Sequence, residues 1–319
     1  MLEHTQAPMV SIVIVSYNCR ELLLGCLSSI QAHVNVSHEV IVVDSASRDF
    51  TVESVRKNHP YVRLFPFRKN VGFVAGNNIG FEHARGELIL MLNPDTLVGP
   101  GTIDGLVSFL FRTLSCAAVG PRLVGADGFD QQSAQFFPSV SGELRKSLGR
   151  IWPWAGRSLE DYALSTRMGL AFKSDWVSGA CMLMRKKAVL ELGGLESLFF
   201  MYYEEVDWCK RASNAGWEIW CAPKYKVIHF GSQSALACNE KVLGGNVHRH
   251  FQRSRFIYFK KHVGILAACI VEAGAFMRIC KNVLKSFGGK TAEECRNLRA
   301  SAFTELRIGL SMLLHLDRA

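Results

Sequence analysis

A short polar segment, Asn93-Pro94-Asp95, follows directly after the mostly apolar residues 86–92. The apolar run is typical of a buried strand, so the sequence predicts a carboxylate at the carboxyl end of that strand. Ligands of open α/β sheets bind beyond these strand ends, where a carboxylate can hold a divalent cation that bridges a diphosphate. The alternative is a turn in which Asp95 only caps the next helix.

A second acidic group begins a helix that we predict to continue to Ala215. It contains Glu204, Glu205 and Asp207. The helix dipole favours acids at this position, which is the simpler explanation. However, the aromatic run of residues 199–203 precedes them, and a carboxylate beside aromatic rings has a raised pKa and suits a general base.

One histidine, His229, follows a predicted strand over residues 226–228 and precedes Phe230-Gly231-Ser232. A single histidine is more often structural than a ligand. Because a loop follows, we expect the His229 side chain to be able to reach a binding site.

Further apolar runs predict the strands that would position these groups. Residues 10–15 and 39–43 are rich in β-branched residues, and a short strand is predicted over 61–65. The first run ends in Ser16-Tyr17-Asn18 and the second in Asp44. Apolar residues at helical spacing follow the first run. This alternation predicts a parallel α/β sheet that binds a nucleotide.

The segment from residue 70 to residue 80 carries three glycines spaced by four, at 72, 76 and 80. This spacing matches neither the dinucleotide-binding nor the P-loop glycine pattern, so a dehydrogenase or a P-loop NTPase is disfavoured. We interpret the segment as a loop that brings the amides of Asn70, Asn77 and Asn78 close to a ligand. A plain turn-rich connection is the alternative.

The pattern weakens between about residues 112 and 172, and the composition of residues 130–170 is typical of a long loop near a substrate cleft. Residues 176–184 then predict a strand entered through a turn of small residues. Separate strands are predicted over 217–222 and 226–228.

The chain has 319 residues, of which 49% are hydrophobic, so it can bury a large core. Its ten cysteines form no C-x-x-C pair and no zinc-type spacing, which indicates reduced thiols in the cytosol. Residues 1–9 lack the apolar core of a signal peptide, so we expect a cytoplasmic protein.

The net charge of +9 is concentrated near the C-terminus. Residues 1–240 contain 23 basic and 23 acidic residues, whereas residues 241–319 contain 14 basic and 5 acidic ones. This asymmetry indicates an anionic partner. Residues 263–280 are apolar but interrupted by Glu272 and Arg278, so they are a poor transmembrane span and instead indicate a helix in the membrane interface.

Residues 306–314 have a similar pattern. The rival interpretation of the whole C-terminal segment is a helical cap or a homodimer interface. A nucleic-acid partner is disfavoured, because residues 1–240 have no basic stripe.

Taken in order, these segments resemble the inverting glycosyltransferase family 2 and, within it, the rhamnosyltransferase-like branch that builds bacterial cell-surface polysaccharides. The resemblance covers about residues 9–260 through five motifs. It implies an α/β fold of the GT-A type with a mostly parallel central sheet. The implied domain spans residues 1–240, and a basic, amphipathic helical extension spans residues 241–319.

The resemblance also implies a role for each matching residue. The nucleotide would contact Ser16, Tyr17, Asn18, Asp44, Asn70, Gly72, Asn77, Asn78 and Asn93. Asp44 resembles the acid that binds the pyrimidine edge, and Asn77 stands where several relatives carry Arg. Asn93-Pro94-Asp95 replaces the family's D-x-D motif, which leaves Asp95 as the main ligand of Mg²⁺ or Mn²⁺, with His229 completing the site.

Glu205 stands at the position of the catalytic Asp, and Glu, one methylene longer, can still serve as the base. The acceptor side would include Trp176, Gly179, Ala180, Glu204 and Asp207. The implied donor is a dTDP- or UDP-sugar, with dTDP-rhamnose favoured, and the implied acceptor is a lipid-linked saccharide at the cytoplasmic membrane face. An inactive nucleotide-sugar-binding scaffold is the alternative. A sugar-phosphate nucleotidyltransferase would need a Gly-rich basic loop after the first strand, which Ser16-Tyr17-Asn18 does not supply.

Overall fold

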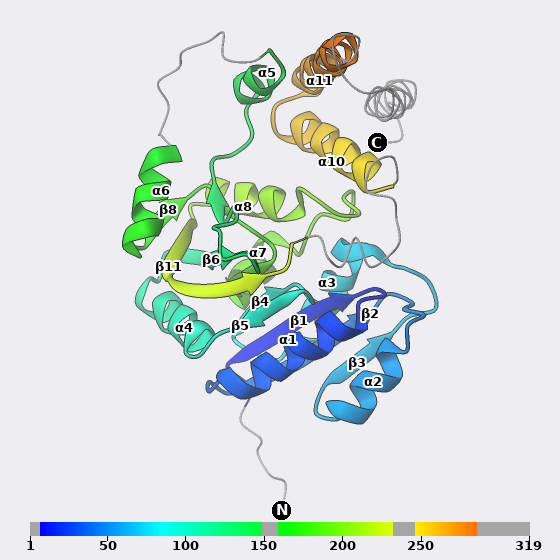
Figure 1. Ribbon diagram of the computed structural model, residues 1–319. Coiled ribbons are helices and arrows are strands. Elements are labelled where there is room, and N and C mark those ends of the chain that lie inside the picture. Colours follow the sequence, from blue (N-terminus) through cyan, green and yellow to red (C-terminus); the bar gives the residue numbers. More distant parts are fainter. Residues whose placement is uncertain (1–6, 149–158, 232–245, 286–319) are drawn as a thin grey trace, which may run out of the picture. The chain divides into compact units, whose positions relative to one another are not determined.

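Figure 1 shows the computed structural model of the chain, which describes residues 7–148, 159–231 and 246–285. The described residues form two compact units. The first contains residues up to 137, residues 159–197 and residues 204–231, and the second contains residues 138–148, 198–203 and 246–285. The predicted helical segment of residues 306–314 lies outside the described residues.

The strands of the first unit are β1 (Val10–Ser16), β2 (His38–Asp44), β3 (Arg63–Pro66), β4 (Leu88–Leu92), β5 (Thr96–Val98), β6 (Cys116–Val124), β7 (Ala134–Gln135), β8 (Phe172–Ser174), β9 (Trp176–Val177), β10 (Cys181–Arg185) and β11 (Glu218–His229). Its helices are α1 (Arg20–His33), α2 (Thr51–Asn58), α3 (Gly72–His83), α4 (Thr102–Arg112), α6 (Leu159–Met168), α7 (Lys186–Leu192) and α8 (Glu204–Asn214).

One large sheet has the strand order β3-β2-β1-β4-β10-β6-β11-β5, and β8 also pairs with β11. Strands β3, β2, β1 and β4 are parallel, whereas β10 runs antiparallel to both of its neighbours. The chain moves outward from β1 to β3 and then returns to β4 on the other side of β1 (Figure 1). A ligand crevice is expected where the winding direction changes in this way.

The predicted α/β architecture is confirmed. All residues of β1 and β4 are buried, as their β-branched and aliphatic composition predicts for central parallel strands. On α1, the helical spacing predicts the buried face, which contains Leu23, Cys26, Leu27 and Ile30. Residues 217–222 and 226–228, predicted as two strands, form the single strand β11, whose pairing with β6 is irregular between Ala222 and Lys226.

The interpretation of residues 70–80 as a loop is wrong, because residues 72–83 form α3. Two of its glycines, Gly76 and Gly80, are one helical turn apart and face β1. A Cβ atom at Gly76 would lie 2.8 Å from Cγ1 of Val15, and one at Gly80 would lie 2.2 Å from Cγ1 of Val13. The four-residue spacing therefore allows close packing of a helix on a sheet.

The second unit contains α5 (Val140–Leu148), α10 (Asn246–His262) and α11 (Ile265–Lys285). Arg255 of α10 forms a two-point ion pair with Glu272 of α11, with N···O distances of 3.0 and 2.9 Å, and the Arg255 side chain is only 3% exposed. Of the two charges that interrupt the apolar run, Glu272 is thus paired with a buried arginine. Among the described helices, none is long and apolar enough to cross a membrane.

Candidate active site

The ends of β1 and β2 are joined by side-chain hydrogen bonds. Ser16 and Asp44 are partners in the sheet register, and Oγ of Ser16 donates to Oδ2 of Asp44 at 3.0 Å. The other carboxylate oxygen of Asp44 accepts the backbone N–H of Ser47 at 3.0 Å. Both side chains are buried, so the predicted nucleotide residues Ser16 and Asp44 form one rigid strand-end structure.

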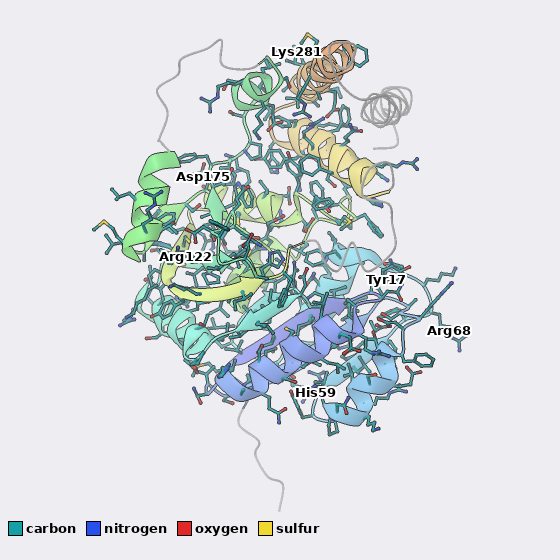
Figure 2. All side chains as sticks on the ribbon, in the orientation of Figure 1. Tyr17, His59, Arg68, Arg122, Asp175 and Lys281 are labelled. Carbon is teal, nitrogen blue, oxygen red and sulfur yellow. The ribbon has the colours of Figure 1, made fainter. Side chains whose placement is uncertain are left out.

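Asn18 connects the loop after β1 with the loop after β2. Its backbone N–H donates to Oγ of Ser47 at 2.9 Å, and its Oδ1 accepts the backbone N–H of Arg48 at 2.7 Å. Asn18 has a φ of 48°, a left-handed conformation that Asn tolerates better than most residues. Tyr17, labelled in Figure 2, is half-buried beside it.

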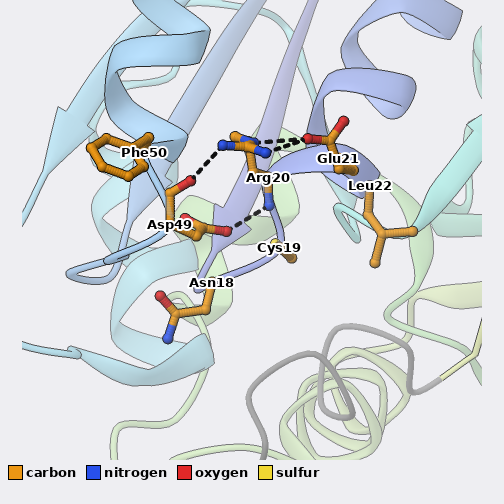
Figure 3. A pocket seen from close by; sticks show the side chains of 7 residues that line it. All are labelled: Asn18, Cys19, Arg20, Glu21, Leu22, Asp49 and Phe50. Carbon is orange, nitrogen blue, oxygen red and sulfur yellow. Dashed lines mark hydrogen bonds and ion pairs between the residues drawn. The ribbon is translucent and has the colours of Figure 1, made fainter.

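An open pocket of about 360 Å³ adjoins these loops (Figure 3). Its lining residues are Asn18, Cys19, Arg20, Glu21, Leu22, Asp49 and Phe50. Of the predicted nucleotide residues, only Asn18 lines it. Phe50 is 68% exposed. Nothing in the sequence indicated that it lines a pocket, because it belongs to no recognisable motif.

The pairing of β5 with β11 brings Asp95 and His229 together. Thr96 and His229 are register partners, and the backbone N–H of Phe230 donates to the carbonyl of Asp95 at 2.9 Å. As a result, Nε2 of His229 lies 3.4 Å from Oδ1 of Asp95, and the Asp95 side chain is 1% exposed. The structure thus brings together the two residues that the sequence predicts as metal ligands, although they are 134 positions apart.

The turn of Gly179 and Ala180 connects the Asn93 segment with Glu205. The carbonyl of Ala180 accepts the backbone N–H of Asn93 at 2.9 Å, and the backbone N–H of Gly179 donates to the Glu205 carboxylate. A Cβ atom at Gly179 would lie 3.1 Å from Cε of Met91 and 3.6 Å from Cβ of Glu205. Because Gly179 has no side chain, the Glu205 carboxylate can approach the end of β4.

The three carboxylates at the start of α8 have different electrostatic surroundings. Burial raises the pKa of Glu205, opposed by hydrogen bonds from its own backbone N–H and from those of Gly179 and Val206. Burial and the neighbouring charge of Glu205 raise the pKa of Glu204 well above its usual range. Asp207 is fully buried and accepts a hydrogen bond from Nε of Arg211 at 2.9 Å.

The remaining predicted nucleotide residues lie on or next to α3. Asn70 is exposed, and its Oδ1 accepts the backbone N–H of Gly72 at 2.9 Å, at the start of the helix. Nδ2 of Asn77 donates to the carbonyl of Phe73, and Asn78 bonds to Leu195. The Asn78 amide thus has protein partners for both of its polar atoms, whereas Oδ1 of Asn77 is buried without a hydrogen-bond partner among the described residues. Contact of either amide with a nucleotide stays a prediction.

On the predicted acceptor side, Trp176 donates from Nε1 to the carbonyl of Phe136 at 3.0 Å. This bond fixes the indole of β9 to the chain that follows β7. Gly179, Ala180, Glu204 and Asp207 lie at the turn before β10 and in the first turn of α8, and α8 also packs against β9, the strand that carries Trp176.

The donor set fits a hard or borderline divalent cation. Asp95 supplies a carboxylate and His229 an imidazole nitrogen, while Oδ1 of Asn93 is buried without a hydrogen-bond partner among the described residues. No group of three or more His, Cys, Asp or Glu side chains in residues 7–148, 159–231 and 246–285 is arranged to hold a metal ion. A cation bound by Asp95 and His229 would therefore need further ligands, of the kind that phosphate oxygens supply.

Comparison with known proteins places the geometry in context. Residues 11–193 match the family model described as "Glycosyl transferase family 2". The chain is 29% identical over 239 residues to the N-acetylglucosaminyl-diphospho-decaprenol L-rhamnosyltransferase of Mycobacterium tuberculosis, which covers 70% of this chain and 76% of the relative. It is 26% identical over 217 residues to the low-salt glycan biosynthesis hexosyltransferase Agl10 of Haloferax volcanii, with 66% and 64% covered.

Two solved structures have the same fold. The mannosyltransferase PcManGT from Pyrobaculum calidifontis, in complex with GDP-Man and Mn²⁺, superposes with a TM-score of 0.58 at 16% identity, over 99% of this chain and 89% of the other. GalNAc-T7 with UDP, GalNAc and Mn²⁺ superposes with a TM-score of 0.56 at 14% identity, over 92% and 55%. These similarities confirm the predicted GT-A fold.

Proposed function

The chain belongs to glycosyl transferase family 2, and we propose that it transfers a sugar, with inversion, from a nucleotide donor to a lipid-linked saccharide. The preferred donor is dTDP-rhamnose, since the M. tuberculosis relative is named as a rhamnosyltransferase acting on a diphospho-decaprenol. A UDP-sugar is the alternative donor.

One observation carries the proposal most directly. The turn of Gly179 and Ala180 binds the carboxylate of Glu205 on one side and the backbone of Asn93 on the other. Glu205, the proposed base, is thereby fixed next to the strand end that carries Asp95. A base and a diphosphate site at one edge of a sheet are the two elements that an inverting transfer requires.

Glu205 would act as the general base in a single displacement. It would remove the proton from an acceptor hydroxyl, whose oxygen then attacks the anomeric carbon while the bond to the nucleotide diphosphate breaks. The configuration inverts, the nucleotide diphosphate leaves, and the proton stays on Glu205 until water removes it. The raised pKa of Glu205 brings its basicity closer to that needed near neutral pH.

Asp95 and His229 would hold Mg²⁺ or Mn²⁺, and the buried Oδ1 of Asn93 faces no other described partner. When bound, the cation would stabilise the negative charge of the departing diphosphate. The strand-end structure of Ser16, Asn18 and Asp44 would bind the nucleoside, with Tyr17 beside it.

The α10–α11 pair would make peripheral contact with the cytoplasmic face of the membrane. Several large apolar residues of α11 are 39–72% exposed, namely Ile265, Leu266, Ile270, Phe276 and Met277. They follow one another at helical spacing, opposite the buried Ala268, Val271 and Ala275. An apolar stripe with basic neighbours such as Lys261 and Lys281 supports binding to anionic lipid.

Titration calorimetry with dTDP, UDP and GDP, each with and without Mn²⁺, tests the donor site. Mn²⁺-dependent binding of dTDP or UDP is expected. Binding of none of the three nucleotides would contradict the proposal.

A transfer assay with Glu205→Gln then tests the base and separates an enzyme from a scaffold. The kcat of the variant should be lower than that of the wild type by a factor of about 100 or more, while nucleotide binding is retained. The scaffold alternative predicts nucleotide binding by the wild type without turnover, and near-normal turnover of Glu205→Gln would remove this residue as the base.

A further inference from the structure

The side chain of Gln131 contacts His229 at two points. Its Nε2 atom lies 2.8 Å from the backbone carbonyl of His229, and its Oε1 atom lies 2.7 Å from Nδ1 of the same imidazole. Gln131 therefore binds both the main chain and the ring of a residue 98 positions away. No motif in the sequence pointed to this glutamine.

The two contacts determine which imidazole nitrogen carries the proton. A backbone carbonyl can only accept a hydrogen bond, so the atom next to it must be the amide nitrogen of Gln131. The atom facing Nδ1 is then the amide oxygen, which also can only accept. Nδ1 of His229 must therefore carry a hydrogen, and in the neutral ring Nε2 has a lone pair.

That lone pair is on the nitrogen that lies 3.4 Å from Oδ1 of Asp95. In the neutral ring, two electron-donating atoms thus face each other in a buried setting. This arrangement favours a cation between or beside them. The contact with Gln131, and not the one with Asp95, disfavours the opposite tautomer, which would place the lone pair of Nδ1 against the amide oxygen of Gln131.

Gln131 is itself held in place by its surroundings. Its backbone N–H donates to the carbonyl of Leu123 at 2.9 Å, and its neighbour Asp130 forms a two-point ion pair with Arg122, which is labelled in Figure 2. On the other side, a Cβ atom at Gly231 would lie 3.2 Å from Nε2 of Gln131, and Gly231 has a φ of 57°. The glycine leaves room for the amide.

We infer that Gln131 is a positioning residue of the metal site, which holds His229 in the Nδ1–H tautomer with Nε2 directed at Asp95. The inference rests on the proposed function in one respect, since it needs His229 to be a metal ligand. Gln131 contacts the carbonyl and Nδ1 of His229, and not Nε2, the nitrogen that would bind the cation. It acts through the orientation and tautomer of His229, as outer hydrogen-bond partners of metal-binding histidines do.

The tautomer is measured on the full-length protein without metal. Long-range ¹H–¹⁵N spectra of the histidine rings, assigned with His229→Ala, distinguish a protonated Nδ1 from a protonated Nε2 in the neutral ring. The wild type should show the Nδ1–H form for His229. A neutral Nε2–H form in the wild type would overturn the inference, whatever the metal affinity.

Metal affinity is measured with Mn²⁺ and UDP or dTDP, using the electron paramagnetic resonance signal of free Mn²⁺. Gln131→Leu removes both hydrogen bonds and should weaken Mn²⁺ binding about tenfold or more. Gln131→Glu keeps an acceptor for Nδ1–H but loses the donor to the His229 carbonyl, so it should retain the tautomer with an Mn²⁺ affinity between those of the wild type and Gln131→Leu. The exposed neighbouring glutamine provides the matched control, Gln132→Leu, which should bind Mn²⁺ like the wild type.

A comparison with His229→Ala distinguishes a failure of the metal site from a failure of the positioning role of Gln131. If His229→Ala weakens Mn²⁺ binding and Gln131→Leu does not, the metal site stands and the positioning role is overturned. If neither His229→Ala nor Asp95→Ala changes Mn²⁺ binding, the proposed metal site fails and the role of Gln131 fails with it. Thermal melting of each variant, followed by circular dichroism, tests whether a loss of affinity comes from a loss of folded structure.

Discussion

The side-chain amide of Asn78 binds both polar backbone groups of Leu195. Its Oδ1 accepts the N–H of Leu195 and its Nδ2 donates to the carbonyl, each at 2.8 Å. Leu195 is buried and lies 117 positions further along the chain. The amide therefore ties α3 to the segment that follows α7.

Replacement of Asn78 should destabilise the fold. Asn78→Ala leaves the N–H and the carbonyl of a buried residue without partners, so the free energy of unfolding should fall by about 1–3 kcal/mol. Urea denaturation measures this change, and Asn58→Ala, at an exposed position of α2, is the control. If Asn78→Ala weakens nucleotide binding at unchanged stability, its main role is the predicted nucleotide contact instead.

Close packing between α3 and β1 predicts a specific steric effect at Gly80. A methyl group there would overlap Cγ1 of Val13, so Gly80→Ala should lower the free energy of unfolding by about 1–3 kcal/mol. The reference is Gly25→Ala on α1, where a Cβ atom would lie an ordinary 3.7 Å from Leu97. That change should stabilise the protein slightly, since alanine favours helix.

The double variant Gly80→Ala with Val13→Ala shows whether the overlap is the cause. Removing the γ carbons of Val13 creates room for the added methyl group, so the combined loss should be smaller than the sum of the two single losses. Additive losses in chemical denaturation would mean that the glycine is needed for another reason.

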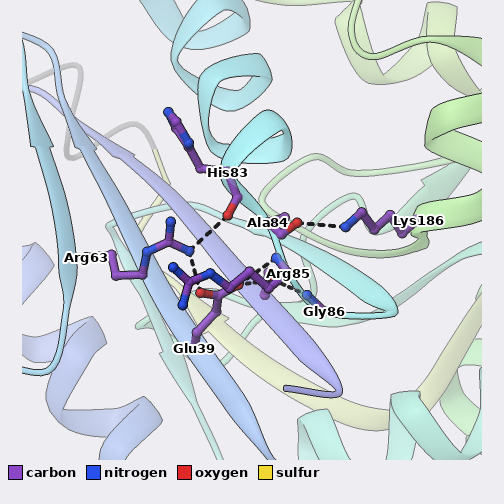
Figure 4. A network of polar contacts seen from close by, with 8 residues as sticks. Glu39, Arg63, His83, Ala84, Arg85, Gly86 and Lys186 are labelled. Atoms are coloured by element: carbon purple, nitrogen blue, oxygen red, sulfur yellow. Dashed lines mark hydrogen bonds and ion pairs between the residues drawn. The ribbon is translucent and has the colours of Figure 1, made fainter. Parts of the chain in front are cut away.

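A network around Glu39 predicts how stability depends on pH (Figure 4). The Glu39 carboxylate accepts hydrogen bonds from Oγ of Ser11 and from the backbone N–H of Arg85, both at 2.7 Å, and pairs with Arg63. Burial alone would raise the pKa of Glu39, but these hydrogen bonds lower it below the usual 4.5. The folded protein therefore binds this proton less tightly than the unfolded chain.

The stabilisation by Glu39 is present above pH 4.5 and is lost as the pH falls through the lower pKa of the folded state. At neutral pH, Glu39→Gln should reduce the free energy of unfolding by about 1–2 kcal/mol, the lower part of the range for charged hydrogen bonds because water partly screens them. Urea denaturation at several pH values should show this difference narrowing below pH 4.5. The exposed Glu53→Gln is the control, and a difference that stays constant with pH would contradict the assignment.

Elements with a local pattern could be predicted from the sequence. The β-branched runs of β1 and β2 and the helical spacing of α1 each indicate burial from a few neighbouring residues. The polar residues after β1 and β4 predict the edge of the sheet at which a ligand would bind. The prediction of α3 failed because its glycines serve a contact with Val13 and Val15, which the local sequence does not reveal.

Long-range features could not be predicted in the same way. Residues 130–170, interpreted as a long loop, contain α5 and α6, whose short apolar stripes give a weak signal. The pairing of Gln131 with His229 depends on the position of β11 beside β6 and β5. Neither spacing nor composition marks this glutamine, whereas Gln132 beside it is exposed.

The adjacent carboxylates Glu204 and Glu205 should have different roles despite their identical chemistry. Repulsion by Glu205 adds to burial in raising the pKa of Glu204 well above its usual range, so Glu204 is the carboxyl that retains its proton. Each of the two carboxyl groups has a buried Oε2 without a hydrogen-bond partner among the described residues, so this atom does not distinguish them. Glu205 differs in accepting backbone hydrogen bonds from Gly179 and Val206 as well as from its own N–H, which favour its charged form. Glu205 remains the one that ionises and can accept a proton.

Glutamine substitutions at the two positions therefore predict opposite outcomes. Because the folded-state pKa of Glu204 is raised, the wild type loses stability as the pH rises above 4.5 towards that pKa, and Glu204→Gln should remove part of this loss. Its kcat should stay within about threefold of the wild type, whereas Glu205→Gln should lose about 100-fold or more. Unfolding free energies and transfer rates, measured across the same pH range, check both statements. If Glu204→Gln abolishes transfer and Glu205→Gln does not, Glu204 is the base and the two assignments are exchanged.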